Sequence, residues 1–168
     1  GNAVAGTIWL LEDVTQRREA RERLAWSAHH DGLTRLLNRS AFETRLAELI
    51  RATATPDGDG GRLPAALLFI DLDCFKAVND NAGHAAGDQV LRDVAAMLVT
   101  HVRGGDAIAR VGGDEFAVLL EHCNAADALH IAEQIRTAAA AIGVDHGELR
   151  LNIGASVGVS MVPAAGAT

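Results

Sequence analysis

Apolar and polar residues follow one another along this chain in patterns typical of both strands and helices. A continuous apolar run at 65–73, AALLFIDLD, predicts a strand that is buried on both faces and whose acidic end opens onto a site. Runs at 106–111 and 115–120 predict two strands joined across Gly112-Gly113, and 149–162 predicts another strand. Apolar residues at helical spacing predict helices at about 40–53, within 74–83, at about 85–101 and at 125–142.

From 65 onward, the predicted elements follow the order β-α-α-β-β-α-β. This order favours an α/β (α+β) sandwich in which helices flank a sheet with a central antiparallel hairpin. Residues 55–64 are rich in Gly and Asp and predict a loop.

The first thirty residues have a different character. Residues 6–15 predict a strand that ends at Glu12-Asp13, and the highly charged stretch 15–30 predicts a helix. We interpret 1–13 as the end of a preceding domain, 14–30 as a linker helix or dimer stalk, and 31–168 as the main domain. A solvated surface helix is the alternative for 14–30.

Composition narrows the function classes. With 168 residues, 49% of them hydrophobic, the chain suits one domain with a substantial core. Its formal net charge of -7 argues against binding to nucleic acid but not against a nucleotide substrate, because a metal ion can neutralise phosphates. Cys74 and Cys123 fit no metal-binding spacing and indicate a reduced, cytoplasmic setting. No apolar run is long enough to span a bilayer, so we expect no direct membrane contact in this segment, whereas the parent protein could carry an anchor elsewhere.

Carboxylates gather at the predicted strand ends. Asp71 and Asp73 alternate onto one face of their strand, and Asp114-Glu115 follow the glycine pair. If they converge, their repulsion calls for a divalent cation, and oxygen ligands suit Mg²⁺. The alternative is that the acids face solvent or pair with Arg110 and Lys76.

The glycine pair and the next turn also carry candidate chemistry. Gly112-Gly113 predicts a tight hairpin turn with positive φ angles, whose bare N–H groups could hold phosphate oxygens; the alternative is a plain turn. Asn79 and Asp88 flank a glycine-rich turn and offer acceptors that suit the donor edge of guanine. Alone, each would serve as a helix cap or a first-turn acid.

Together these motifs resemble the GGDEF family, the diguanylate cyclases. The signature is present letter for letter in 112–116, and DGLTRLLNR, FIDLDCFKAVNDNAGHAAGD and ARVGGDEFAVLL match in order from about His30 to the C-terminus. The resemblance implies a palm-like nucleotidyl-cyclase fold with a mostly antiparallel sheet. It also implies condensation of two GTP into cyclic di-GMP with release of pyrophosphate, performed by two domains that face each other in a homodimer.

The resemblance also implies a role for each matching residue. Metal ligands are expected at Asp71, Glu115 and the Leu72 carbonyl, with two Mg²⁺ or Mn²⁺ per active site. Catalytic carboxylates are expected at Asp114 and Glu115. Substrate contacts are expected at Asn79 and Asp88 (guanine), Phe75, Lys76, Gly112 and Gly113 (phosphates) and His84 (the nucleoside pocket). Arg103 and Asp106 match the RxxD motif, where cyclic di-GMP binds and inhibits; the alternative is a surface ion pair.

One departure from the family pattern and two further resemblances define the alternatives. The family domain continues past the last predicted strand with another helix and strand, so the resemblance implies that 31–168 lacks both. Residues 1–13 resemble the end of a PAS sensor domain. The residues within the motifs resemble those of proteins in which a phosphodiesterase (EAL) domain follows. A catalytically weak GTP- or cyclic di-GMP-binding module that regulates such a neighbour is therefore an alternative. A palm-like nucleotidyltransferase acting on nucleic acid is a third hypothesis, against which the acidic charge speaks.

Overall fold

A computed structural model describes residues 26–54, 64–147 and 149–162 of the chain. The predicted strand at 6–15 and most of the predicted helix at 15–30 lie outside these ranges. Within them no helix is long and apolar enough to cross a membrane. The described elements are β1 (Leu37–Asn38), α2 (Arg39–Ala54), β2 (Ala65–Asp73), α3 (Phe75–Ala82), α4 (His84–His101), β3 (Ala107–Arg110), β4 (Glu115–Leu120), α5 (Ala125–Ala139), β5 (Gly143–His146), β6 (Leu149–Asn152) and β7 (Gly154–Val162).

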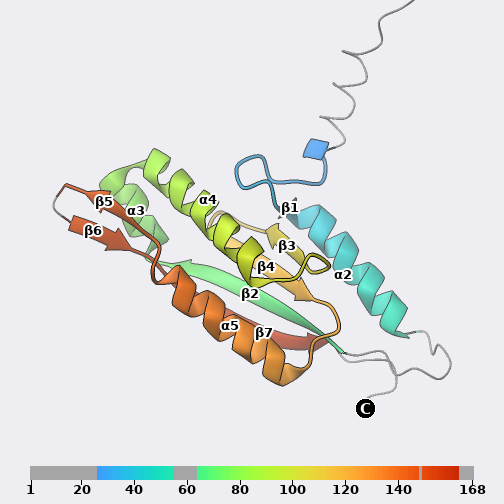
Figure 1. The fold of residues 1–168 in the computed structure, drawn as a ribbon. Helices are drawn as coiled ribbons and strands as arrows, with labels where there is room; N and C mark the ends of the chain where they lie inside the picture. The colour runs from blue at the N-terminus through green and yellow to red at the C-terminus, as the bar shows by residue number, and fades with distance from the viewer. Residues whose placement is uncertain (1–25, 55–63, 148, 163–168) are drawn as a thin grey trace, which may run out of the picture.

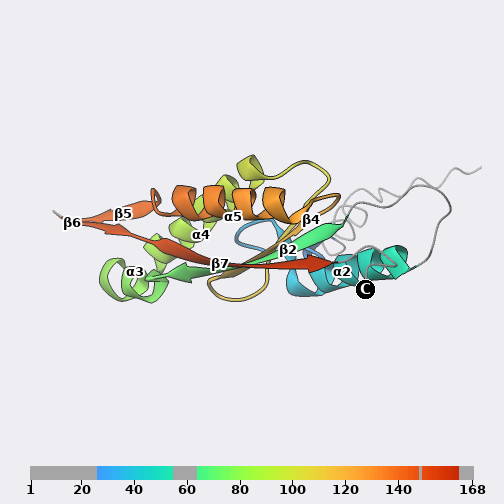
Figure 2. The same cartoon turned by 90° about the horizontal axis from the view of Figure 1, so that it is seen from below.

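One mixed sheet organises the domain (Figure 1). Five of the described strands join in the order β1-β3-β4-β2-β7; β1 runs parallel to β3, and the other neighbours are antiparallel. Helices α4 and α5 cover one face, and α2 lies on the other, beneath β3 and β4 (Figure 2). The predicted α+β sandwich with a mostly antiparallel sheet is therefore confirmed.

The alternation of side chains along the two central strands separates two apolar clusters. Leu68, Ile70 and Phe116 face α4 and α5 in the main core, and each is at most 1% exposed. The alternate residues Ala117 and Leu119 face α2, where they pack with Phe42. Because both faces of β4 are covered, the strand is a nearly continuous apolar run. The prediction that 65–73 is buried on both faces is wrong for the second half of β2, where Phe69, Asp71 and Asp73 are exposed on the side away from α4 and α5.

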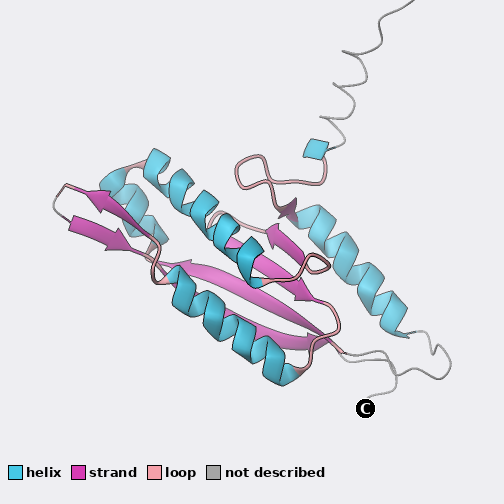
Figure 3. Ribbon diagram, in the orientation of Figure 1, coloured by secondary structure: helices cyan, strands magenta, loops and turns pink. Residues whose placement is uncertain are grey.

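The predicted strand at 149–162 is wrong in one respect. It is two strands: β6 pairs with β5 in a separate hairpin, and β7 pairs with β2 in the main sheet (Figure 3). The break falls at Ile153, which is buried and donates its N–H to the Ile142 carbonyl at 3.1 Å. The residue therefore leaves both ladders, and its apolar side chain serves the core instead.

A tight turn joins the N-terminal segment to the sheet; we name residues 29–38 the linker turn. The Asp31 carboxylate accepts hydrogen bonds from the Thr34 N–H and hydroxyl at 2.8 and 2.7 Å, and from Arg110 Nη1 at 3.3 Å. Asn38 N–H donates to the His29 carbonyl at 2.9 Å and closes the turn at its far end. Burial raises the pKa of Asp31, but the bonds from Thr34 and the charge of Arg110 outweigh burial and hold the pKa below its ordinary value.

We expect Asp31→Asn to lower the free energy of unfolding by about 1 kcal/mol at pH 7, because it removes charge-assisted hydrogen bonds at a partly exposed site. The folded-state pKa lies below the unfolded-state value near 4, so this stabilisation is complete above about pH 4 and is lost as the pH falls through the folded-state pKa. Urea unfolding at pH 7 and at successively lower pH measures the difference in unfolding free energy between the variant and the wild type. The exposed Asp145, paired with Arg150, supplies the control Asp145→Asn. An effect of Asp31→Asn that is equal at every pH would contradict the assignment.

Candidate active site

Two carboxylates face each other where the central strands end. Antiparallel pairing of β2 with β4 sets Ile70 opposite Phe116 and, one step further, Asp71 opposite Glu115. Both acids are exposed, and neither forms an ion pair with another described residue. Like charges placed directly opposite on neighbouring strands repel, so this pair has no structural benefit of its own.

A hollow lies beside this pair, on the sheet face opposite α4 and α5. Its volume is about 340 Å³, and Phe69, Asp71, Glu115, Ser156 and Gly158 line it. Figure 2 shows the loop between β3 and β4 on this same side of the sheet. The carboxylate pair therefore borders a concave surface instead of projecting from a flat one.

The predicted geometry of the glycine pair is wrong. Neither Gly112 nor Gly113 has a positive φ, and the strands are joined by four residues, 111–114, instead of two. The N–H groups of Val111 and Gly112 both donate to the Glu115 carbonyl, at 2.9 and 3.3 Å. Gly112 is needed for space, because a Cβ at this position would overlap the Glu115 carboxylate. We name 111–114 the signature loop.

Backbone groups at the signature loop are left available. Leu72 N–H donates to the Asp114 carbonyl at 3.2 Å, so the Leu72 carbonyl points toward the same edge of β2. Among the described residues, no signature-loop N–H donates to this carbonyl, and the N–H groups of Gly113 and Asp114 make no hydrogen bond. The Leu72 carbonyl therefore receives no hydrogen bond from the signature loop and lies at the edge of β2 that faces β4, next in sequence to Asp71.

This donor set fits a hard divalent cation. Two carboxylates and one carbonyl are the oxygen ligands that Mg²⁺ takes when water and phosphates complete its shell. The predicted convergence of three carboxylates is not found: no group of three His, Cys, Asp or Glu within the described ranges is placed to hold a metal. Asp73 shares the face of Asp71 but accepts hydrogen bonds from the Ser156 hydroxyl at 3.0 and 3.3 Å.

Helix α3 begins immediately after the carboxylates because Cys74 adopts a left-handed conformation, with φ 65° and ψ 10°. This conformation is unusual for a residue with a side chain, and it turns the chain from strand to helix within one residue. Phe75 packs its ring against the main core, whereas Lys76 is exposed. The backbone of α3 thus starts beside the acidic end of β2.

The two predicted guanine contacts come from neighbouring helices. Asn79 of α3 lies against Gly87 of α4, where a Cβ would overlap the Asn79 amide, and Asp88 follows directly in α4. Gly83, with φ 84°, makes the turn between the helices. His84 is the exposed first residue of α4. The fold therefore brings Asn79 and Asp88 together at one helix–helix contact.

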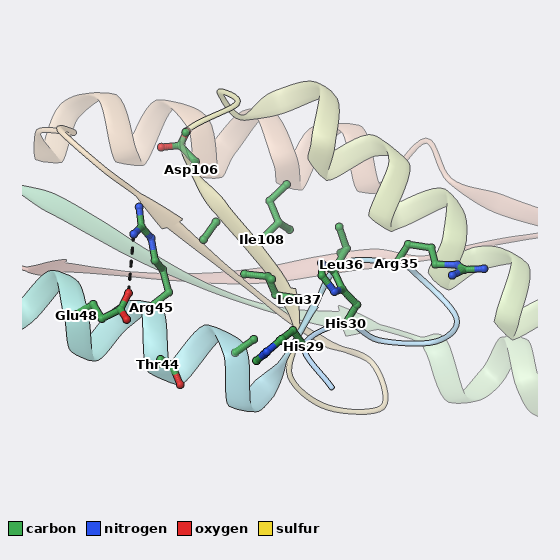
Figure 4. A pocket seen from close by; sticks show the side chains of 13 residues that line it. His29, His30, Arg35, Leu36, Leu37, Thr44, Arg45, Glu48, Asp106 and Ile108 are labelled. Carbon is green, nitrogen blue, oxygen red and sulfur yellow. Dashed lines mark ion pairs between the residues drawn. The ribbon is translucent and has the colours of Figure 1, made fainter. Parts of the chain in front are cut away.

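Asp106 of the RxxD motif organises a turn. Its carboxylate accepts from the N–H of Arg103 at 2.9 Å and from the N–H of Glu121 at 3.0 Å. The Arg103 guanidinium makes no ion pair with Asp106, so the alternative of a simple surface ion pair is not what the structure shows. Asp106 also borders a second hollow of about 630 Å³ between α2 and β3, with Arg45 and Glu48 on its α2 wall (Figure 4).

Sequence analysis did not single out Arg39, and it named Arg110 only as an alternative partner of the site acids. Hydrogen bonding to Glu43 raises the pKa of the exposed Arg39, and the charge of Glu115 adds to that rise. Arg110 pairs with Asp31 and not with the site acids. Arg39 lies in the motif DGLTRLLNR, and Arg110 lies in ARVGGDEFAVLL. Their position in these motifs was the only signal in the sequence that pointed to a role near the site.

Comparison with known proteins identifies the family. The profile of the family "Diguanylate cyclase, GGDEF domain" matches residues 28–168. The chain belongs to this family, as the motifs predict.

Individual relatives and a solved structure agree with this assignment to the family. The "Probable diguanylate cyclase DgcE" of Escherichia coli is 45% identical over 133 residues, which are 79% of this chain and 12% of that protein. The "Diguanylate cyclase TpbB" of Pseudomonas aeruginosa is 45% identical over 139 residues, which are 82% of this chain and 29% of that protein. The chain therefore spans less than a third of these relatives. The coiled coil and GGDEF domain of DgcB from Caulobacter crescentus, solved in complex with c-di-GMP, superimposes with a TM-score of 0.76 at 30% identity, covering 90% of this chain and 78% of that one.

We expect Gly112→Ala to weaken binding of Mn²⁺, used as a probe of the site, roughly tenfold or more, because the added methyl group displaces the Glu115 carboxylate. Unfolding free energy should change by no more than about 1 kcal/mol, since only the end of a flexible side chain must move. Gly113→Ala is the matched control: its Cβ would meet nothing within 4 Å. Isothermal titration calorimetry compares the two variants, and equal Mn²⁺ affinities would contradict the role assigned to Gly112.

Proposed function

We propose that this chain is the catalytic domain of a diguanylate cyclase, which condenses two GTP molecules into cyclic di-GMP and releases two pyrophosphates. The observation that carries this proposal is the pairing of Asp71 with Glu115 at the ends of the central strands, beside the Leu72 carbonyl and the start of α3. An acidic pair with no partner has a reason to exist where a cation and phosphates complete it.

Asp71, Glu115 and the Leu72 carbonyl would hold the cations, Mg²⁺ or Mn²⁺, with two proposed per active site. When bound, such ions neutralise phosphate charge and favour ionisation of the attacking 3′-hydroxyl. The unused N–H groups of Gly113 and Asp114, together with Lys76, bind and orient phosphate oxygens. Asp114 or Glu115 is proposed to accept the proton of the attacking hydroxyl.

Each domain is proposed to bind one GTP, so two copies must face each other as a homodimer. The 3′-oxygen of each GTP then forms a bond to the α-phosphorus of the other as the bond to pyrophosphate breaks. Asp88 accepts hydrogen bonds from the guanine N1 and N2 donors, and Asn79 reads the remaining edge. The contact of Asn79 with Gly87, next to Asp88, supports this pairing.

Product inhibition through Arg103 and Asp106 is part of the proposal. Asp106 already fixes the turn, which leaves the exposed Arg103 guanidinium available for phosphate or guanine. The hollow beside Asp106 offers adjoining space.

We expect the full-length protein that contains this chain to convert GTP and Mg²⁺ into cyclic di-GMP, and Glu115→Gln to lower kcat roughly 100-fold or more while the fold stays intact. Chromatography of the products measures turnover, and circular dichroism checks the fold. Glu133→Gln, which breaks an exposed pair with Arg136 on α5, is the control. Consumption of GTP without cyclic di-GMP would exclude the proposal, and GTP binding without turnover would favour a regulatory module.

We expect Asp88→Ala to reduce the preference for GTP over ATP by roughly one to two powers of ten, because the variant loses the acceptor for two guanine donors. Competition between the two nucleotides in a binding assay measures this preference without requiring turnover. Asp93→Ala, on the same helix at an exposed position, is the control. An unchanged preference in Asp88→Ala would remove Asp88 from the guanine pocket.

A further inference from the structure

Arg110, the last residue of β3, joins two parts of the chain that are far apart in sequence. Its side chain is only 16% exposed. Nη2 and Nε donate to the Gly113 carbonyl at 2.7 and 3.2 Å, and Nη1 donates to the two Asp31 carboxylate oxygens at 3.3 and 3.4 Å. One guanidinium therefore bonds the signature loop and the linker turn at the same time.

The bond to the Gly113 carbonyl determines how the signature loop presents its backbone. Because a peptide unit is planar and trans, a carbonyl held toward Arg110 directs the N–H of Asp114 the opposite way. That N–H is one of the two that make no hydrogen bond among the described residues. The same peptide unit immediately precedes Asp114 and Glu115. Its orientation therefore also affects the direction in which their side chains leave the backbone.

Little else fixes the middle of this loop. Side-chain packing is absent at Gly113, where even an added Cβ would meet nothing within 4 Å. The remaining bonds lie at the loop ends, from Val111 and Gly112 to the Glu115 carbonyl, and from Leu72 to the Asp114 carbonyl. Glycine has the widest conformational freedom of any residue, so an unsupported Gly113 peptide would rotate readily.

The Asp31 end of the link is well anchored. Asp31 also accepts from Thr34, donates its own N–H to the Leu36 carbonyl at 2.8 Å, and accepts at its carbonyl from the Arg35 N–H at 3.0 Å. The linker turn is thus a rigid support, and it lies where the N-terminal segment enters the domain (Figure 1).

We propose that Arg110 is a positioning residue, which holds the Gly113 peptide and the carboxylates after it in a productive orientation set by the linker turn through Asp31. This inference rests on the proposed cyclase function. It assigns Arg110 no contact with substrate; the residue acts through the loop. A displacement of the linker turn would reach the signature loop through this side chain, in addition to the pairing of β1 with β3.

The test compares Arg110→Lys, Arg110→Gln and Asp31→Asn in the full-length protein. Lysine keeps the charge and can pair with Asp31, but a single ammonium lacks the planar fork that reaches both partners. We expect both Arg110 variants to lower kcat roughly 10- to 100-fold, with KM for GTP changed less than about threefold. Asp31→Asn should lower kcat by a smaller factor in the wild-type background and have no further effect in the Arg110→Gln background.

Hydrogen exchange gives a readout that does not depend on turnover. In both Arg110 variants the hydrogen-bonded amides of the signature loop, Val111 and Gly112, should exchange faster, whereas those of β2 keep their wild-type rates. Arg150→Gln, which breaks the exposed pair with Asp145, should change neither kcat nor loop exchange.

Two results would overturn the inference: variants with wild-type kcat and only a lower Tm, or loop exchange unchanged in Arg110→Gln. If the wild-type protein makes no cyclic di-GMP, the proposed function fails. The loop-exchange result then still decides whether Arg110 positions the loop, so the two failures can be told apart.

Discussion

The antiparallel register between β2 and β4 is the constraint on which the site depends. A slip of one residue would expose Ile70 and Phe116, and burying each such side chain contributes about 1.5–3 kcal/mol. Repulsion between Asp71 and Glu115 in an exposed setting is nearer 1 kcal/mol. The core therefore determines the register, and the register places the two acids opposite each other on the open face.

Glycine serves this fold by leaving room for polar side chains. Gly112 leaves space for the Glu115 carboxylate, and Gly87 leaves space for the Asn79 amide. In both places a functional side chain from one element lies where a Cβ of another would otherwise be. The candidate metal subsite and the candidate guanine subsite therefore both require a residue without a Cβ at the point of contact.

The signature loop combines precise ends with a weakly packed centre. Its ends belong to the β3–β4 and β2–β4 ladders, whereas Gly113 is held by Arg110 alone among the side chains described. Segments with few packed contacts open at low free energy, which agrees with the proposed binding of a nucleotide beside this loop. A support that comes from the linker turn ties this local freedom to the first described residues of the domain.

The order of the elements from β2 to α5, and the family, follow from the sequence alone, whereas the short strands β1 and β5 were not predicted. The strand at 65–73 and the helix at 85–101 are recognised from the local spacing of apolar residues. The signature at 112–116 is recognised from its residue types alone. Tertiary structure alone decided the division of 149–162 into two strands, because a strand ends where its partner changes. It also decided the contacts of Asp73 with Ser156 and of Arg110 with Asp31. These contacts join residues whose proximity arises only from sheet register and chain path, which no local pattern records.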